Sequence, residues 1–207
     1  MSKLLIPPAF GRQDVQIETR ERVFGGFCNI DHVQLRHRRF ECQTFGPTLK
    51  RELVVRRPAV GVLIHDPIHR TFVLIEQFRI GAIHDTLSPW QLEVVAGLID
   101  DGESAEQAVI REALEETGIH IAAPERLHQF YPSAGGCDEH FTLYAATADL
   151  SDAGGVHGAA DEGENIRIHV VECDTISALL RSGRLVNGPV IIALQWLHTQ
   201  YGTPQEG

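Results

Sequence analysis

The segment Gly97–Ile119 constrains the fold more than any other part of the chain, because it specifies a loop and then a helix with both ends marked. Ser104 and Gln107 have the spacing of a capping box, which predicts that the helix begins directly after Ser104. Gly118 is the residue type that most often ends a helix in the left-handed conformation. The signals predict a helix of about three and a half turns.

Three glutamates share one face of this predicted helix. At about 100° of rotation per residue they lie within a sector of about 100°, together with small apolar residues. The residues of this face are Glu112, Glu115, Glu116, Ala105, Ala108 and Val109. Ile110 and Leu114 point the opposite way, with Ala113 beside them, so we expect them to form the stripe that faces the core.

The acidic face has two interpretations. One is a solvated surface with an ordinary ion pair between Arg111 and Glu115, four residues apart. The other is a metal site, because clustered carboxylates repel one another unless a cation neutralises them. Ligand sets made only of oxygen suit hard ions such as Mg²⁺, which is commonly bound alongside substrate phosphates.

The same segment matches a longer pattern, G-x5-E-x7-R-E-U-x-E-E-x-G-U, in which U is an apolar residue. The matching residues are Gly97, Glu103, Arg111, Glu112, Glu115, Glu116 and Gly118, with Ala113 and Ile119 at the U positions. At about 7% usage per residue type, such a match arises by chance on the order of once in 10⁷ to 10⁸ positions. The segment resembles the Nudix box. The resemblance implies a Mg²⁺-dependent hydrolase, with Mn²⁺ as the alternative metal, that cleaves a diphosphate linked to another moiety.

The composition limits the size and the partners of the protein. With 207 residues, 43% of them hydrophobic, the chain is long enough for one good core, or for one domain and a small appendage. A net charge of −10 argues against a general nucleic-acid binder. The segment Arg36–Arg57 is locally basic, which favours either attraction of an anionic small molecule or a solubilising surface.

The cysteines and the apolar runs indicate a soluble cytoplasmic protein without a membrane partner. The cysteines form no C-x-x-C pair, so neither a zinc ribbon nor a disulfide scaffold is expected. They are Cys28, Cys42, Cys137 and Cys173. The apolar start of the chain is too short for a secretory signal, and Val190–Leu194 is far too short to span a bilayer. His65 and His69 flank a turn signal, so we expect no zinc there.

The first part of the chain shows short alternating runs over residues 15–23, 27–36 and 40–45, which predict a small antiparallel sheet. Such a sheet buries little by itself, so we expect it to pack on the main domain or on a second subunit. Turn residues at Gly46–Pro47 place the domain boundary there. The prediction is an N-terminal β-sheet domain over residues 1–47 and a Nudix domain over residues 48–207.

The main domain alternates longer apolar strands with helices. Strands are predicted over residues 53–64, 71–80, 90–96, 126–131, 140–148 and 166–171, and helices over 174–181, capped by Asp174, and 189–199. This order favours a mixed α/β architecture. The expected fold is a Nudix-type α/β/α sandwich with a mixed sheet, plus the small N-terminal antiparallel sheet.

Further stretches resemble the bacterial ADP-ribose pyrophosphatases over nearly the full length. They are L-K-R-E, V-L-I-E-Q-F-R-I, P-W-Q-L-E-V-V-A-G, S-A-G-G-C-D-E, H-G-A-A-D-E-G-E-N-I-R-I-H-V-V and I-A-L-Q-W-L. The resemblance implies that Glu162 is the general base. It implies metal ligands at Ala96 (carbonyl), Glu112, Glu115, Glu116 and Glu164, and supporting roles for Gly97, Glu103, Arg111 and Gly118. Without it, the acidic loop 158–165 would be interpreted as solvated.

The resemblance also implies a substrate site. Its residues are Phe27, Cys28, Arg51, Glu52, Arg56, Arg79, Leu98, Ser133, Ala134, Gly135 and Glu139. Arginines suit phosphates, and Phe27 would stack on adenine, with Cys28 where relatives often carry a second aromatic residue. In the family the N-terminal sheet is exchanged across a homodimer, so Phe27 and Arg51 would serve the partner's site.

One departure from the family pattern concerns the substrate. The family's proline, sixteen residues after Gly118, is replaced by Ala134, while Pro132 lies two positions earlier. The expected activity is hydrolysis of ADP-ribose to AMP and ribose 5-phosphate, and the alternative is another nucleoside diphosphate sugar, such as another ADP-sugar or GDP-mannose. A non-catalytic nucleotide-sensing Nudix module and a purely structural dimerisation module are the rivals from other classes.

Overall fold

The computed structural model describes residues 6–159 and 163–201. The chain divides into two compact units. The smaller contains the N-terminal part up to Arg56 together with Ser133–Glu139, and the larger contains Arg57–Pro132 and the part from His140 onward. Predicted site residues occur in both units.

The smaller unit is built on a three-stranded antiparallel sheet in the order β1-β2-β3. The 3₁₀ turn η1 (Arg12–Asp14) precedes β1 (Val15–Gly25), which is followed by β2 (Asn29–His37) and β3 (Leu49–Val55). The segment 133–139 belongs to this unit because it pairs with β3. The Val54 N–H donates to the carbonyl of Gly136 at 2.8 Å, and the Asp138 N–H donates to the carbonyl of Val54 at 3.1 Å.

The predicted strand over residues 40–45 is wrong. A turn occupies this stretch, closed by the Gln43 N–H on the carbonyl of Arg39 at 2.9 Å. Gln43 has a φ of 58°, a left-handed conformation that a strand does not contain. The third strand is β3, which lies beyond the boundary predicted at Gly46–Pro47.

The larger unit contains an eight-stranded mixed sheet in the order β10-β11-β5-β4-β9-β8, with β6 paired to β5 and β7 paired to β4. Its strands are β4 (Ala59–Asp66), β5 (Thr71–Phe78), β6 (Trp90–Glu93), β7 (Val95–Leu98), β8 (Glu125–Phe130), β9 (Phe141–Thr147), β10 (Val156–His157) and β11 (Ile166–Glu172). The β4·β9 pair is parallel and the other pairs are antiparallel.

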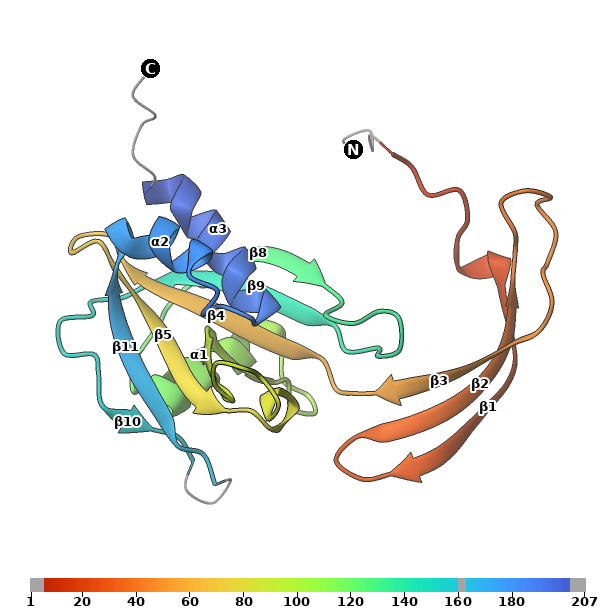
Figure 1. The fold of residues 1–207 in the computed structure, drawn as a ribbon, viewed down its shortest axis with the longest axis horizontal. Coiled ribbons are helices and arrows are strands. Elements are labelled where there is room, and N and C mark those ends of the chain that lie inside the picture. Colours follow the sequence, from red (N-terminus) through yellow and green to blue (C-terminus); the bar gives the residue numbers. More distant parts are fainter. Residues whose placement is uncertain (1–5, 160–162, 202–207) are drawn as a thin grey trace. The chain divides into compact units, whose positions relative to one another are not determined.

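Helices cover both faces of this sheet (Figure 1). Helix α1 (Ala105–Thr117) packs on the face that includes Val73 and Ile75, while α3 (Gly188–Tyr201) packs on the face that includes Phe72 and Leu74. The shorter elements are η2 (Ile80–Ala82), η3 (Cys173–Thr175) and α2 (Ile176–Arg181). The alternation along β5 places successive side chains in two hydrophobic cores. The predicted α/β/α sandwich with a small additional sheet is confirmed.

Several predicted boundaries needed correction. The strand predicted over residues 53–64 is interrupted at residues 56–58, where the Arg56 N–H donates to the Asp138 carboxylate instead of to a strand. The strand predicted over 90–96 is split, so that β6 follows β5 and β7 follows β4. The short strand β10 was not expected. Asp174 does not cap α2, which begins at Ile176, but pairs with Arg70 at 3.0 Å.

Two further findings concern the whole chain. Cys28, Cys42, Cys137 and Cys173 are all free thiols, as expected from their spacing. Among the helices of residues 6–159 and 163–201, none has the length and apolar character needed to cross a membrane.

Candidate active site

The ends of α1 are formed by the predicted signals. The Gln107 N–H donates to Ser104 Oγ at 3.2 Å, and the Ser104 N–H donates to Gln107 Oε1 at 2.9 Å. Gly118 has a φ of 71° and its N–H donates to the carbonyl of Leu114 at 2.8 Å. The capping box and the left-handed end fix the length of the helix, and both predictions are confirmed.

The predicted core-facing stripe of α1 is wrong for Ile110 and Leu114 and correct only for Ala113. Ile110 and Leu114 are 39% and 42% exposed. The side that packs against the sheet carries Ala108, Val109 and Ala113. The small alanines let the helix approach the sheet closely. The glutamate face is therefore turned partly inward, and its carboxylates are partly desolvated.

Glu116 and Glu112 are pressed against strand β7. Glu116 is 2% exposed, and its Oε2 accepts a hydrogen bond from the Ala96 N–H at 3.0 Å. At Gly97 a Cβ atom would lie only 1.8 Å from Glu112 Oε1, so only glycine leaves room for this carboxylate. The first box residue and the box glutamates thus meet in space, with the peptide group of Ala96 beside them.

The electrostatics of this cluster disfavour three separate negative charges. Burial is the main cause that raises the pKa of Glu116 to about 8; the Ala96 N–H opposes this shift, and the charges of Glu112 and Glu164 contribute to it. Burial also raises the pKa of Glu112, against the effect of Arg111. The charge of Glu164 contributes to the raised pKa of both helix glutamates. The carboxylate of this loop residue therefore lies near Glu112 and Glu116. Desolvated, mutually repelling carboxylates are the environment that a divalent cation stabilises.

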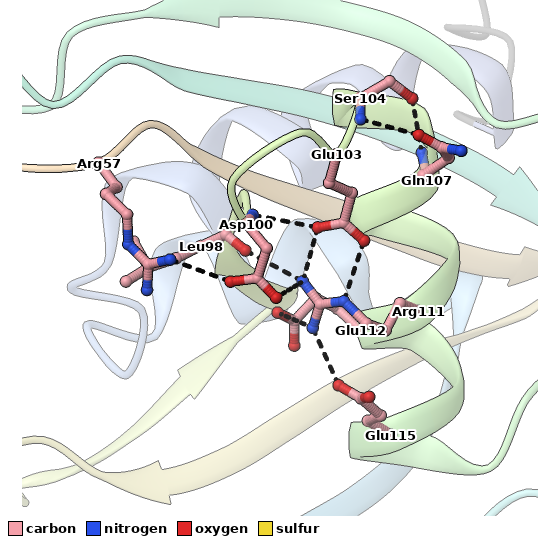
Figure 2. A network of polar contacts seen from close by, with 9 residues as sticks. All are labelled: Arg57, Leu98, Asp100, Glu103, Ser104, Gln107, Arg111, Glu112 and Glu115. Carbon is pink, nitrogen blue, oxygen red and sulfur yellow. Dashed lines mark hydrogen bonds and ion pairs between the residues drawn. The ribbon is translucent and has the colours of Figure 1, made fainter.

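Arg111 forms hydrogen-bonded ion pairs with the box residues Glu103, Glu112 and Glu115 (Figure 2). Its Nε and Nη2 donate to the two oxygens of Glu103, both at 3.0 Å, and Nη2 also donates to the carbonyl of Leu98 at 3.1 Å. Its Nη1 donates to Glu112 at 2.8 Å and to Glu115 at 3.0 Å. The guanidinium therefore orients Glu112 and ties the helix to the preceding loop.

The loop before the helix is held by a second set of contacts. The Asp100 N–H donates to Glu103 Oε2 at 3.1 Å, and Arg57 Nη1 donates to Asp100 Oδ1 at 2.9 Å (Figure 2). Arg111 in turn holds the pKa of Glu103 below its usual value. Glu103 thus anchors the loop that precedes α1. Within residues 6–159 and 163–201 it makes no hydrogen bond to Glu116.

Arg79 lies at the end of β5, next to the acidic cluster. Its guanidinium donates to Glu93, with Nη2 to Oε2 at 2.8 Å. The charges of Glu93, Glu116 and Glu164 raise the pKa of Arg79, although its own burial opposes this. A cation of the protein therefore faces the carboxylates, in the position that an anionic substrate would need. Glu93 was not among the predicted residues; a charged residue in the apolar run W-Q-L-E-V-V-A is the signal for it.

The predicted substrate residues of the smaller unit form a group of their own. Arg56 pairs with Glu139 at 3.0 Å, and its guanidinium lies 5.7 Å from the centre of the Phe27 ring. The carbonyl of Ser133 accepts from the N–H groups of Gly136 and Cys137. The segment 133–139 is thereby folded into a tight turn that carries Ala134 and Gly135.

Arg51 differs from most of its basic neighbours in having no acidic partner in the described part of the chain. Arg36, Arg38 and Arg39 each pair with a carboxylate. Arg51 donates only to the carbonyl of Lys50, at 2.8 Å. Most arginines of the segment Arg36–Arg57 are thus already paired with a carboxylate. Arg51 has no such partner among the described residues, which leaves its guanidinium available to an anion.

The predicted residues divide between the two units as follows. The smaller unit contains Phe27, Cys28, Arg51, Glu52, Arg56, Ser133, Ala134, Gly135 and Glu139; the larger contains Arg79, Ala96, Gly97, Leu98, Glu103, Arg111, Glu112, Glu115, Glu116, Gly118 and Glu164. Glu162, the predicted general base, lies outside the described residues. Glu115 is more exposed than Glu112, with side-chain exposures of 53% and 13%.

A second acidic group lies at the β4–β5 turn. Ligand atoms of Asp66, His69 and Asp149 lie within 4.8 Å of one another. Asp66 is already satisfied, because it accepts from the N–H groups of Ile68 and His69 and from the His69 ring at 2.7 Å. His65 bonds to Tyr201 instead. We interpret this group as the cap of a turn, because the Asp66 carboxylate is occupied by the hydrogen bonds of the turn.

The larger unit also has a surface hollow of about 330 Å³. Its lining residues are Glu76, Ser88, Trp90, Val156, Asn165 and Arg167. None of the predicted site residues in the described part of the chain is among them, so the hollow is distinct from the carboxylate cluster.

One known family matches most of the chain. The model of the NUDIX domain matches residues 55–193. The chain belongs to the Nudix family. The matched range includes the box helix, Arg79, Glu93 and the acidic loop of the larger unit.

Individual Nudix relatives resemble the chain beyond the domain. The ADP-ribose pyrophosphatase of Escherichia coli (strain K12) is 39% identical over 196 residues, which cover 95% of this chain and 93% of the relative. The ADP-ribose pyrophosphatase of Haemophilus influenzae is 34% identical over 200 residues, covering 95% and 92%. The GDP-mannose pyrophosphatase of Citrobacter koseri is 30% identical over 151 residues, covering 72% and 78%. The protein is a Nudix hydrolase.

Proposed function

We propose that this Nudix hydrolase cleaves the diphosphate of ADP-ribose to give AMP and ribose 5-phosphate. The observation that carries the proposal is the pair of Glu116, which is buried, and Glu112, which is partly buried, both held against β7. The identity of 39% to an ADP-ribose pyrophosphatase over 95% of the chain supports the choice of substrate.

The donor set fits a divalent metal, Mg²⁺ with Mn²⁺ as the alternative. The residues that would hold it are Glu112, Glu115, Glu116, Glu164 and the carbonyl of Ala96. They offer only oxygen, which these hard cations prefer. When bound, the metal neutralises charge on the diphosphate and lowers the pKa of a water molecule.

The protein's own side chains would bind and orient the diphosphate. Arg79 supplies a cation for a non-bridging phosphate oxygen, because its guanidinium already faces the carboxylate cluster. Arg111 holds Glu112 in a fixed position, and Glu103 holds Arg111. Glu162 would take the proton of the attacking water as general base; we assign this role from the resemblance of the loop sequence to that of the ADP-ribose pyrophosphatases.

The adenosine half of the substrate would be bound by the smaller unit. Phe27 offers an exposed ring for stacking on adenine, Glu52 accepts from an amine or a hydroxyl, and Arg51 and Arg56 supply cations. Phe27 is 84% exposed, which a stacking residue requires. Supporting contacts would come from Cys28, Ser133, Ala134, Gly135 and Glu139 of the smaller unit and from Leu98 of the larger unit.

We also propose a homodimer in the cytoplasm, with the sheet domain of residues 1–47 as the dimerisation element. Exposed apolar side chains of the smaller unit support an interface. They are Ile17, Val23, Phe24, Phe27 and Phe40. The free cysteines suit a reducing compartment. We expect neither nucleic acid nor a membrane as a partner.

The test is a product assay on purified protein. With Mg²⁺ the protein should convert ADP-ribose to AMP and ribose 5-phosphate, and EDTA should abolish the reaction. Glu116→Gln should lose most of the activity, because the buried carboxylate would no longer be available to the metal. Failure to release either product from ADP-ribose, with turnover of GDP-mannose or another ADP-sugar, would exclude this substrate.

The alternative substrate class has two observations in its favour. GDP-mannose pyrophosphatases also match the chain, at 30% identity over 72% of its length. Ala134 stands where the family's ADP-ribose enzymes carry a proline, in the turn that follows Ser133. The same assay with a panel of nucleoside diphosphate sugars decides between the two. A nucleotide-sensing module would bind ADP-ribose in calorimetry and release no product with any metal.

A further inference from the structure

Glu93 is a buried carboxylate that belongs to neither the box nor the predicted substrate site. It is 5% exposed and lies at the end of β6, just before β7. Buried carboxylates are rare unless they are paired and fully hydrogen-bonded. Glu93 meets this condition through donors from three residues of the larger unit, Gln77 and Arg79 at the end of β5 and Asn187 before α3.

Arg79 is the charged partner of Glu93. Its Nε lies 3.2 Å from Oε1 and 3.1 Å from Oε2, and its Nη2 lies 2.8 Å from Oε2. These hydrogen bonds fix the plane of the guanidinium as well as its distance from the Glu93 carboxylate. The side chain of Arg79 remains 46% exposed. In the described part of the chain its Nη1 has no hydrogen-bond partner, so one edge of the guanidinium is left for a ligand.

Two amide side chains hold Glu93 from other directions. Asn187 Nδ2 donates to Oε1 at 3.0 Å, from the residue directly before α3. Gln77 Nε2 donates to Oε2 at 3.4 Å, from β5. Both oxygens of Glu93 are therefore fixed before any substrate binds. A carboxylate held in this way cannot rotate to follow Arg79, so Arg79 must adopt the orientation that Glu93 sets.

We propose that Glu93 is a positioning residue that orients Arg79 toward the diphosphate of the substrate. The inference rests on the proposed function, since Arg79 is assigned to the diphosphate there. Glu93 itself would not touch the substrate. A pre-oriented cation stabilises the developing charge of phosphoryl transfer without reorganisation during the reaction.

A double-mutant cycle tests this role. Glu93→Gln keeps the shape and the acceptor oxygen but removes the charge and one half of the fork, and it should lower kcat/KM for ADP-ribose by roughly 10- to 100-fold. In the background of Arg79→Ala, the same change should have little further effect, because the residue it positions is gone. An equal loss in both backgrounds would overturn the proposal.

Glu76→Gln is the matched control. Glu76 is also a strand carboxylate that pairs with an arginine, Arg184, and with His169, and neither partner is assigned to the metal or the substrate. Its substitution should change thermal stability to a similar degree and leave kcat/KM within about twofold. If Glu76→Gln lowered kcat/KM as much as Glu93→Gln, the effect would be one of general stability and the proposal would fail.

Binding of inorganic pyrophosphate by calorimetry separates this proposal from the proposed function. In the presence of Mg²⁺, Glu93→Gln should weaken pyrophosphate binding about tenfold or more, and Mn²⁺ binding alone should be unchanged. This readout does not require turnover. The wild-type protein could fail to hydrolyse ADP-ribose while the double-mutant cycle, measured as pyrophosphate affinity, still showed coupling between Glu93 and Arg79. In that case only the assignment of ADP-ribose as the substrate would be rejected. Additive effects on pyrophosphate affinity would exclude the role of Glu93.

Discussion

At the scale of single residues, the site depends on the close approach of Gly97 and the Glu112 carboxylate. Gly97 has room for no side chain, because the Glu112 carboxylate occupies the space where a Cβ would be. The pattern in the sequence requires a glycine here but gives no reason for it. The reason is contact between two box residues that lie far apart along the chain.

Gly97→Ala should therefore displace Glu112 without unfolding the protein. We expect a loss of activity on the order of 100-fold, since a shift of about 1 Å at a reacting centre has effects of this size. Gly81→Ala is the control, because a Cβ there would meet nothing within 4 Å. Activity assays and circular dichroism on both variants check this; equal activity of the two would show that Glu112 tolerates displacement.

At the scale of elements, the box helix shows what periodicity can and cannot predict. The caps at Ser104 and Gly118 were predicted correctly, because capping depends on residues three or four positions apart. Most of the buried face was predicted incorrectly, because hydrophobicity favoured Ile110 and Leu114 over Ala108 and Val109, which share a face with the glutamates. Small side chains let this side of the helix pack closely against the sheet. The sequence alone does not give the position of the sheet relative to the helix.

The β4–β5 hairpin carries a pH-dependent contact between Asp66 and His69. Hydrogen bonds from the His69 ring and backbone lower the pKa of Asp66, and Asp66 raises the pKa of His69. The Asp66 contribution is present above its unfolded pKa of about 3.9 and is lost as the pH falls. The His69 contribution is complete below about 6.5 and is lost as the pH rises through its raised pKa.

Thermal unfolding across pH should reveal this window. His69→Ala should lower the melting temperature most between about pH 4 and 6.5, and less at pH 9, where only the uncharged hydrogen bond remains to be lost. His84→Ala, at an exposed histidine outside the hairpin, is the comparison. A difference that is constant across the whole pH range would show that the charge of His69 is not involved.

At the scale of the whole molecule, the residues assigned to one substrate belong to two structural units. The carboxylate cluster and Arg79 lie in the larger unit, and Phe27, Arg51 and Arg56 lie in the smaller one. The sheet of the smaller unit buries few apolar side chains within one chain. A small sheet of this kind requires a further surface for stability, and in the proposed homodimer the partner chain provides it.

Subunit complementation tests whether the two halves of a site come from different chains. Arg51→Ala and Glu116→Gln should each be nearly inactive alone. Co-expression should restore activity to about a quarter of the wild-type value, because about half of the dimers are mixed and each has one intact site. Sites built within single chains would give no recovery. Light scattering should report a dimer for each variant.

The sequence by itself determined the box helix, its ends and the order of most strands, and its resemblance to the Nudix box led to the proposed ligands of a divalent metal. These follow from hydrogen bonds and spacings within a few residues, and from a pattern too long to arise by chance. Only the tertiary structure decided which face of α1 is buried, where the third strand of the small sheet lies, and that Glu93 holds Arg79. These depend on contacts between segments distant in the chain, whose free energies are set by packing and desolvation once the sheet has formed.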